Sequence, residues 1–289
     1  MLYIHTIMFY LILAIILFSF NNVLWKKNIQ ITSISFLIAY RSFFTVFITC
    51  VILFLFIETE QVTQFDHLKI TIGSIFGVIG LFSMLSVLKK SSLQWIGIYN
   101  LIGVGYTSLY VLIFEDLEIS RIIIGLFLIV TGFLLFIYSN TRKLKLSWKE
   151  HLLLTTMILS FSSSSIIQWK NLSTNISPIL IIANQETIVF IISAFLVIHT
   201  LKKTQIRKGI TSHFRPVFLM SIILLTAFTS SLFGLKNTNP LISGSLFLLN
   251  PISTILFSSF FFKEKISLKS WLSIIVISIG VYLLYLQTI

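Results

Sequence analysis

Ten apolar stretches, each long enough to cross a membrane, follow one another along almost the whole chain. A hydrocarbon core of about 30 Å needs about twenty apolar helical residues to span it. Because lipid offers backbone N–H and C=O groups no partners, each stretch must be a helix. The predicted spans are 7–25, 34–57, 70–88, 93–114, 121–138, 151–168, 177–199, 217–235, 241–262 and 270–287. The sequence therefore predicts an all-α integral membrane protein with ten transmembrane helices.

The composition agrees with this class. Hydrophobic residues make up 56% of the chain and charged residues only 10%, outside the range of soluble domains. The first apolar stretch has no preceding Lys or Arg and no small-residue cleavage site after it, so we expect it to remain as a helix. The single cysteine, Cys50, excludes a disulfide within the chain.

The net charge of +12 does not indicate nucleic-acid binding, because the basic residues lie in the short connections between spans. Sixteen of the 21 Lys and Arg residues lie in the odd-numbered connections and four in the even-numbered ones. Cytoplasmic loops of membrane proteins carry an excess of Lys and Arg. The bias predicts a multi-pass protein of the cytoplasmic membrane with both termini outside.

The second half of the chain repeats features of the first. At an offset of 144, Trp25-Lys26 recurs as Trp169-Lys170, and Arg41 aligns with Gln185. Such duplication is typical of secondary transporters built from inverted repeats. We therefore predict two five-helix inverted repeats, residues 1–138 and 151–289, joined by a basic connecting loop at residues 139–150.

Several short segments of the second half carry a resemblance to a known family. They are Asn239-Pro-Leu-Ile-Ser-Gly-Ser-Leu-Phe-Leu-Leu-Asn-Pro251, Phe262-Lys-Glu-Lys-Ile-Ser267 and Gly280-Val-Tyr282. At an offset of 148, Gly103, Asp116 and Gly132 stand where Pro251, Glu264 and Gly280 do. With these segments the chain resembles the EamA-like ten-helix branch of the drug/metabolite transporter (DMT) superfamily.

The resemblance implies a transporter without a bound cofactor. Members of the superfamily move amino acids, metabolites, nucleotide sugars or cationic drugs, and they are generally drawn with cytoplasmic termini, opposite to the charge count above. The family motifs are patterns of small and apolar residues, so they indicate the fold and not the substrate.

Two ionisable residues, Arg41 and Glu186, lie well inside predicted spans, at nearly equivalent positions of the two repeats. A charge at the bilayer centre costs about 2.5–3.5 kcal/mol on insertion scales, so we expect them to pair or to serve a function. The pair is either a fixed contact between the halves or a coupling site at which Glu186 exchanges a proton. A third interpretation has Arg41 extending toward the headgroups.

Polar residues inside other spans are candidates for a substrate cavity. Asn100, Tyr106 and Asn250 lie in spans four and nine, where their amide and hydroxyl groups could orient a solute. Asn21, Asn22 and Ser165 lie in spans one and six, which line the cavity in the family that the chain resembles. Small and aromatic residues at such spacings also serve helix packing alone, and this alternative stays open.

We interpret the chain as a secondary active transporter that moves a small organic solute by alternating access, with export favoured and proton coupling through Glu186 as an option. The alternative is an integral-membrane enzyme acting on a lipid-linked substrate, although the five histidines are scattered and no catalytic or metal-binding arrangement is recognisable. The expected partners are the solute and the lipid bilayer, with no nucleic acid, and the expected state is a monomer.

Overall fold

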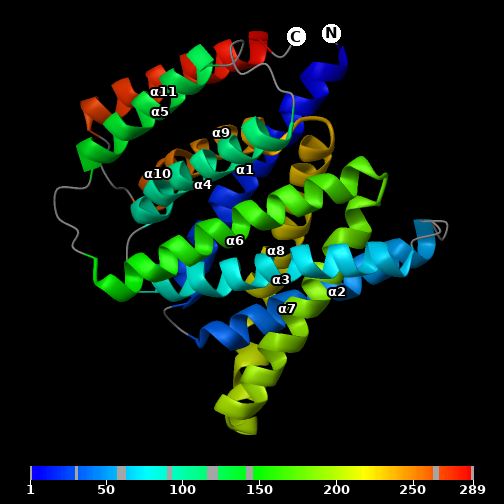
Figure 1. The fold of residues 1–289 in the computed structure, drawn as a ribbon. Coiled ribbons are helices and arrows are strands. Elements are labelled where there is room, and N and C mark those ends of the chain that lie inside the picture. The colour runs from blue at the N-terminus through cyan, green and yellow to red at the C-terminus, as the bar shows by residue number, and fades with distance from the viewer. Residues whose placement is uncertain are drawn as a thin grey trace.

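The computed structural model describes residues 2–29, 32–56, 63–89, 93–115, 123–140, 146–262 and 267–287. These residues form helices and short connections, without a strand. In chain order the helices are α1 (Leu2–Ile29), α2 (Ile34–Phe56), α3 (Gln64–Leu88), α4 (Leu93–Phe114), α5 (Ile123–Asn140), α6 (Trp148–Ser173), α7 (Pro178–Thr200), α8 (Lys203–Lys236), α9 (Pro240–Phe247), α10 (Leu249–Phe262) and α11 (Leu268–Gln287) (Figure 1). The predicted all-helical class is confirmed.

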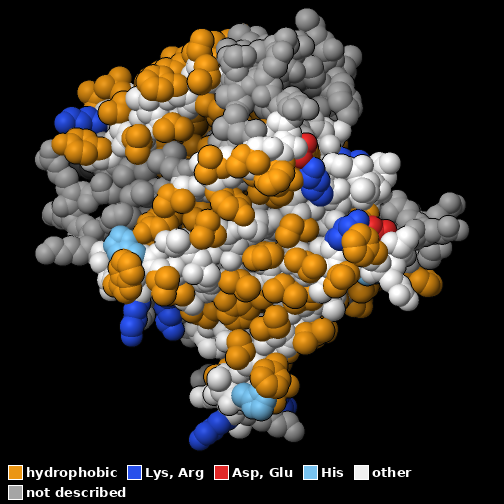
Figure 2. All heavy atoms as spheres, in the orientation of Figure 1, with side chains coloured by type: hydrophobic (Ala, Val, Ile, Leu, Met, Phe, Trp, Pro, Cys, Tyr) orange, Lys and Arg blue, Asp and Glu red, His pale blue; other side chains and the backbone are white. Residues whose placement is uncertain are grey.

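Six helices are long and apolar enough to cross a membrane, among the residues that could be assessed: α1, α2, α3, α6, α7 and α8. Helices α5 and α11 contribute the shorter apolar segments Ile123–Phe136 and Leu268–Gly280. Large apolar side chains cover much of the surface, including Phe54, which is 89% exposed, and Phe260, which is 80% exposed (Figure 2). Exposed apolar area of this extent suits contact with lipid tails. The count of ten spans remains a prediction.

The seventh connection is helical, because α8 begins at Lys203 whereas the predicted eighth span begins at residue 217, so Pro216 lies inside the helix. This first part of α8 packs on α2. The Tyr40 hydroxyl donates to the Ile210 carbonyl at 3.2 Å, and a Cβ added at Gly209 would lie 2.7 Å from the Phe36 ring. Packing against a neighbouring helix makes an interior proline tolerable.

The predicted ninth span is divided into α9 and α10 at Leu248. Pro251 has no N–H, so the Phe247 carbonyl lacks its normal helical donor four residues later. The Leu248 N–H donates to the Ser245 carbonyl at 3.2 Å, a tighter bond of the i→i+3 type. Pro251 was visible in the sequence, although the prediction made residues 241–262 one continuous helix.

The two halves of the chain pack mainly against each other. Helix α2 lies against α7, α3 against α6, α1 against α8 and α10, α4 against α6 and α9, and α5 against α11 (Figure 1). Each of these pairs joins a helix before the connection at residues 141–147 to a helix after it. The core of the protein is therefore an interface between halves.

The α5–α11 contact depends on two glycines. A Cβ added at Gly280 would lie 2.8 Å from the Ile129 backbone nitrogen and 2.9 Å from the Gly125 carbonyl oxygen. A Cβ added at Gly132 would lie 2.7 Å from the Ile277 side chain. Glycine thus lets two helix backbones approach closely, as in small-residue packing between membrane helices.

We predict that Gly280→Ala lowers the free energy of unfolding by about 1–3 kcal/mol, because the added methyl group meets backbone atoms that cannot move aside cheaply. Gly105→Ala is the matched control, since a Cβ there meets nothing within 4 Å. Thermal unfolding of the purified protein in detergent measures both. Equal melting temperatures for the two variants would contradict the packing described for α5 and α11.

Candidate functional site

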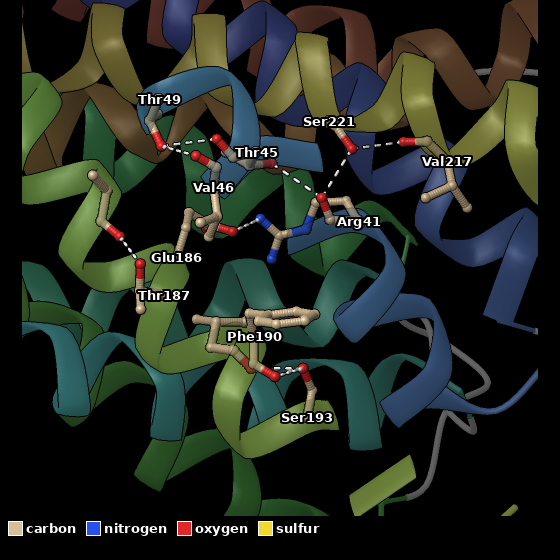
Figure 3. Close-up of polar contacts among 12 residues, drawn as sticks. Arg41, Thr45, Val46, Thr49, Glu186, Thr187, Phe190, Ser193, Val217 and Ser221 are labelled. Atoms are coloured by element: carbon tan, nitrogen blue, oxygen red, sulfur yellow. Dashed lines mark hydrogen bonds and ion pairs between the residues drawn. The ribbon is translucent and has the colours of Figure 1, made fainter. Parts of the chain in front are cut away.

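A buried ion pair connects α2 to α7. The Arg41 Nη1 donates to the Glu186 Oε2, and the exposed fractions of the two residues are 0% and 1% (Figure 3). Arg41 lies seven residues after the start of α2 and Glu186 eight after the start of α7. At 1.5 Å per residue, both lie about 10–12 Å into their helices. The structure thus brings together the two intramembrane charges that the sequence singled out.

The surroundings of the pair are mostly apolar. The Arg41 guanidinium lies over the Trp25 ring, with its Cζ 5.9 Å from the ring centroid. Trp25 is 1% exposed and belongs to a cluster with Val189 and Val217, from α7 and α8. A charge is solvated poorly in such an environment, so each member of the pair depends on the other. The pair with Trp25 links α1, α2 and α7.

Two hydroxyl groups donate hydrogen bonds to the backbone carbonyl of Arg41. The Ser221 hydroxyl of α8 donates to the Arg41 carbonyl at 3.0 Å, and the Thr45 hydroxyl donates to the same carbonyl at 3.2 Å (Figure 3). Thr49 follows one turn later, and its hydroxyl donates to the Thr45 carbonyl at 2.8 Å. Arg41, Thr45 and Thr49 therefore form a polar stripe along one face of α2.

Two of the predicted cavity residues meet at the contact between α1 and α10. The Ser19 hydroxyl lies 2.8 Å from the Asn250 Oδ1 and 3.0 Å from the Asn250 carbonyl, and the Asn22 Nδ2 lies 3.4 Å from that Oδ1. Asn21, on the same helix, is 2% exposed, and its Oδ1 has no hydrogen-bond partner among the described residues. Ser19 is the partner that the sequence prediction left out.

The other predicted cavity residues lie on α4 and α6. The Tyr106 hydroxyl is 3.3 Å from the hydroxyl of Ser163, a residue of α6 that was not among the candidates. Asn100 and Ser165 are both half-buried. The helices adjoin in the order α1, α10, α4 and α6. That order places all six candidates on one connected set of helices, while their role in binding a solute stays a prediction.

A polar layer between α3, α6 and α7 was not predicted. The Ser74 hydroxyl donates to the Asn184 Oδ1 at 2.9 Å, the Ser164 hydroxyl donates to the Gly73 carbonyl at 2.8 Å, and the Asn171 Nδ2 donates to the Gln168 Oε1 at 2.9 Å. Asn184 lies inside a predicted span, next to Gln185. An amide within an apolar stretch was the signal that could have found this layer.

The described residues include no group of three or more His, Cys, Asp or Glu side chains placed to hold a metal ion. Of the acidic residues near the end of α4, Glu115 forms an ion pair with Lys170, while Asp116 and Glu118 lie outside the described residues.

We predict that Arg41→Gln or Glu186→Gln alone lowers the free energy of unfolding by about 3–5 kcal/mol, because each leaves an unpaired charge in an apolar environment. The double variant should recover most of that loss, since neither charge remains. Thermal unfolding of the four proteins in detergent gives the coupling energy. Additive losses in the double variant would show that the two side chains do not interact.

The comparisons with known proteins agree with this architecture. Residues 148–286 match the sequence model of the EamA-like transporter family. One solved structure, described as "Crystal structure of protein", matches 95% of this chain and 94% of its own with a TM-score of 0.71. At 13% sequence identity that likeness shows the fold alone. No curated protein matches the chain in sequence.

The family match confirms the resemblance drawn from the segments between Asn239 and Tyr282. It also supports a multi-pass membrane protein. The second half of the chain thus matches the EamA-like transporter family, which is consistent with the drug/metabolite transporter superfamily.

Proposed function

We propose that this protein is a secondary active transporter that moves a small organic solute out of the cell, across the cytoplasmic membrane, by alternating access. The observation that carries the proposal is the buried Arg41–Glu186 pair, because it joins equivalent helices of the two halves inside the protein. The match to a transporter family favours transport over the enzymatic alternative. The protein would act as a monomer, since one chain supplies both halves.

The proposed repeats are residues 1–138 and 151–289. In this comparison α1, α2, α3 and α5 correspond to α6, α7, α8 and α11, and α4 corresponds to α9 and α10 together. Most contacts between helices then have a counterpart. The contact of α3 with α6 corresponds to that of α8 with α1, and the contact of α4 with α6 corresponds to that of α10 with α1. At the offset of 148, Gly132 corresponds to Gly280 and Ile129 to Ile277. Gly132 approaches Ile277 and Gly280 approaches Ile129, so the two contacts are reciprocal. This reciprocity supports a two-fold relation between the halves.

The ion pair suits a contact that opens and closes. Desolvation of two buried charges offsets most of their attraction, so the intact pair adds little net stability. If α2 and α7 separate as the halves rock, Glu186 can take up a proton and Arg41 can meet another anion. Glu186 would thereby couple transport to the proton gradient. The candidates for solute contacts remain Asn21, Asn22, Asn100, Tyr106, Ser165 and Asn250.

The proposed orientation has the basic, odd-numbered connections in the cytoplasm and both termini outside. Contacts between the even-numbered connections support their placement on one side of the membrane, opposite to the odd-numbered connections. Lys170, near the end of α6, pairs with Glu115, at the end of α4, and the Trp169 Nε1 donates to the Thr238 carbonyl before α9 at 3.0 Å. Even-numbered connections thus lie near one another, as an alternating path through a membrane requires.

A tag at the C-terminus should be labelled by a membrane-impermeant reagent in intact cells, because the charge bias places that end outside. A tag inserted after Lys202, in an odd-numbered connection, should be labelled only after permeabilisation. The reverse pattern would contradict the charge-based orientation and support cytoplasmic termini.

Untargeted mass spectrometry of cells and medium tests transport itself. Cells that express the wild-type protein should redistribute one class of metabolite across the membrane without changing its chemical identity. Glu186→Gln should abolish the dependence of that redistribution on the pH gradient, because a side-chain amide does not titrate and cannot bind and release a proton as a carboxylate can. Thr187→Val is the control, since the Thr187 hydroxyl donates within its own helix, to the Ala183 carbonyl at 2.7 Å, and has no other hydrogen bond to the described residues.

Unchanged pH-gradient dependence in Glu186→Gln would remove the proposed coupling but not transport. A chemically modified metabolite in place of a redistributed one would favour the enzyme.

A further inference from the structure

Arg41 uses only one of its two hydrogen-bonding edges. Its Nη1 donates to Glu186, while its Nε and Nη2 have no hydrogen-bond partner among the described residues. The side chain is nevertheless fully buried, at 0% exposure. Leaving a buried donor unsatisfied costs about 1–3 kcal/mol, and more for a charged group. A guanidinium kept in this arrangement therefore indicates an acceptor that arrives from outside the chain.

The geometry of the unused edge restricts that acceptor. The N–H groups at Nε and Nη2 point in parallel, and this fork matches the two oxygens of a carboxylate or a phosphate. The ion pair with Glu186 shows that this guanidinium already binds one carboxylate, through its Nη1. The two edges can hold two carboxylates at once, one from the protein and one from a ligand.

The neighbouring helix adds a second unsatisfied group. Asn21 lies one helical turn before Trp25, on the same face of α1, and the Arg41 guanidinium lies over the Trp25 ring. The Asn21 Oδ1 is a buried acceptor without a donor among the described residues. Unused donors on α2 thus lie over the Trp25 ring, and an unused acceptor lies one turn earlier on α1.

We propose that the solute carries a carboxylate, which binds the Nε–Nη2 edge of Arg41, while its apolar part contacts Trp25. The proposal rests on the transport function proposed above and names the substrate class of that site. Glu186 already balances the single charge of Arg41, so a second anion leaves the site with one net negative charge. A monovalent carboxylate adds less charge than a phosphate dianion, and a cation would be repelled by Arg41. Separation of α2 and α7 would admit the solute.

The test measures binding to the purified full-length protein in detergent, independently of transport. Melting temperatures are recorded with L-phenylalanine, L-lactate and benzoate, with the amide of each acid, and with sodium phosphate. At least one acid should raise the melting temperature while its amide does not. Arg41→Lys keeps the charge opposite Glu186 but removes the fork, so it should weaken binding of that acid by about 10-fold or more. Thr187→Val should bind as the wild type does, because the Thr187 hydroxyl donates to the Ala183 carbonyl of its own helix.

A second readout does not depend on the folding of Arg41→Lys. The same acid should change the intrinsic fluorescence of the wild-type protein, and Trp25→Phe should lose that change while its melting temperature still rises with the acid. Equal effects of acid and amide, undiminished binding in Arg41→Lys, stabilisation by phosphate alone, or no effect of any acid would each overturn the proposal. Redistribution of a neutral or cationic metabolite, without carboxylate binding, would leave the transport function standing and remove this inference.

Discussion

A charge inside a hydrocarbon-like environment must find a partner, and here the partners come from different halves of the chain. Arg41 on α2 and Glu186 on α7 are both buried, with Trp25 of α1 against the guanidinium. Neither half can satisfy its own charge, so this requirement sets the register of α2 against α7. Ser221 extends the link to α8 through the Arg41 carbonyl. Removing either charge should be costly, because the other charge would then be buried without a partner, yet the intact ion pair adds little to the free energy of folding. These two properties are expected of a contact that can separate.

The remaining interfaces between the halves have a different character. At α5 and α11, Gly132 and Gly280 let the helices approach so closely that a Cβ at either position would lie within 3 Å of the other helix. At α3 and α6, an α3 glycine carbonyl, that of Gly73, accepts from Ser164. Dispersion and backbone hydrogen bonds of this kind are lost as soon as helices move apart by an ångström or two. Motion between the halves is therefore easier to accommodate at the α2–α7 pair than along the glycine contacts.

Hydrophobicity alone predicted the helical class and, within a few residues, most helices, because membrane spans must satisfy their own backbone hydrogen bonds. It misplaced the start of α8, because a proline such as Pro216 is common at the start of a helix. The packing of Gly209 on Phe36, which accompanies the earlier start, depends on tertiary structure. Arg41 and Glu186 were predictable because intramembrane charges are rare. The partners in the Ser19–Asn250 and Ser74–Asn184 bonds were not predictable, because they depend on which helices adjoin, although the amide of Asn184 within an apolar stretch marks a polar position.

The most direct test of the central claim asks whether α2 and α7 must separate for transport. Phe43 on α2 and Phe190 on α7 have ring centroids 6.0 Å apart, and cysteines at both positions, with Cys50 replaced by serine, can be joined by a short reducible crosslinker. The account predicts that crosslinking stops solute redistribution, that reduction restores it, and that neither single-cysteine variant responds. Full transport by the crosslinked protein would contradict an opening between these helices.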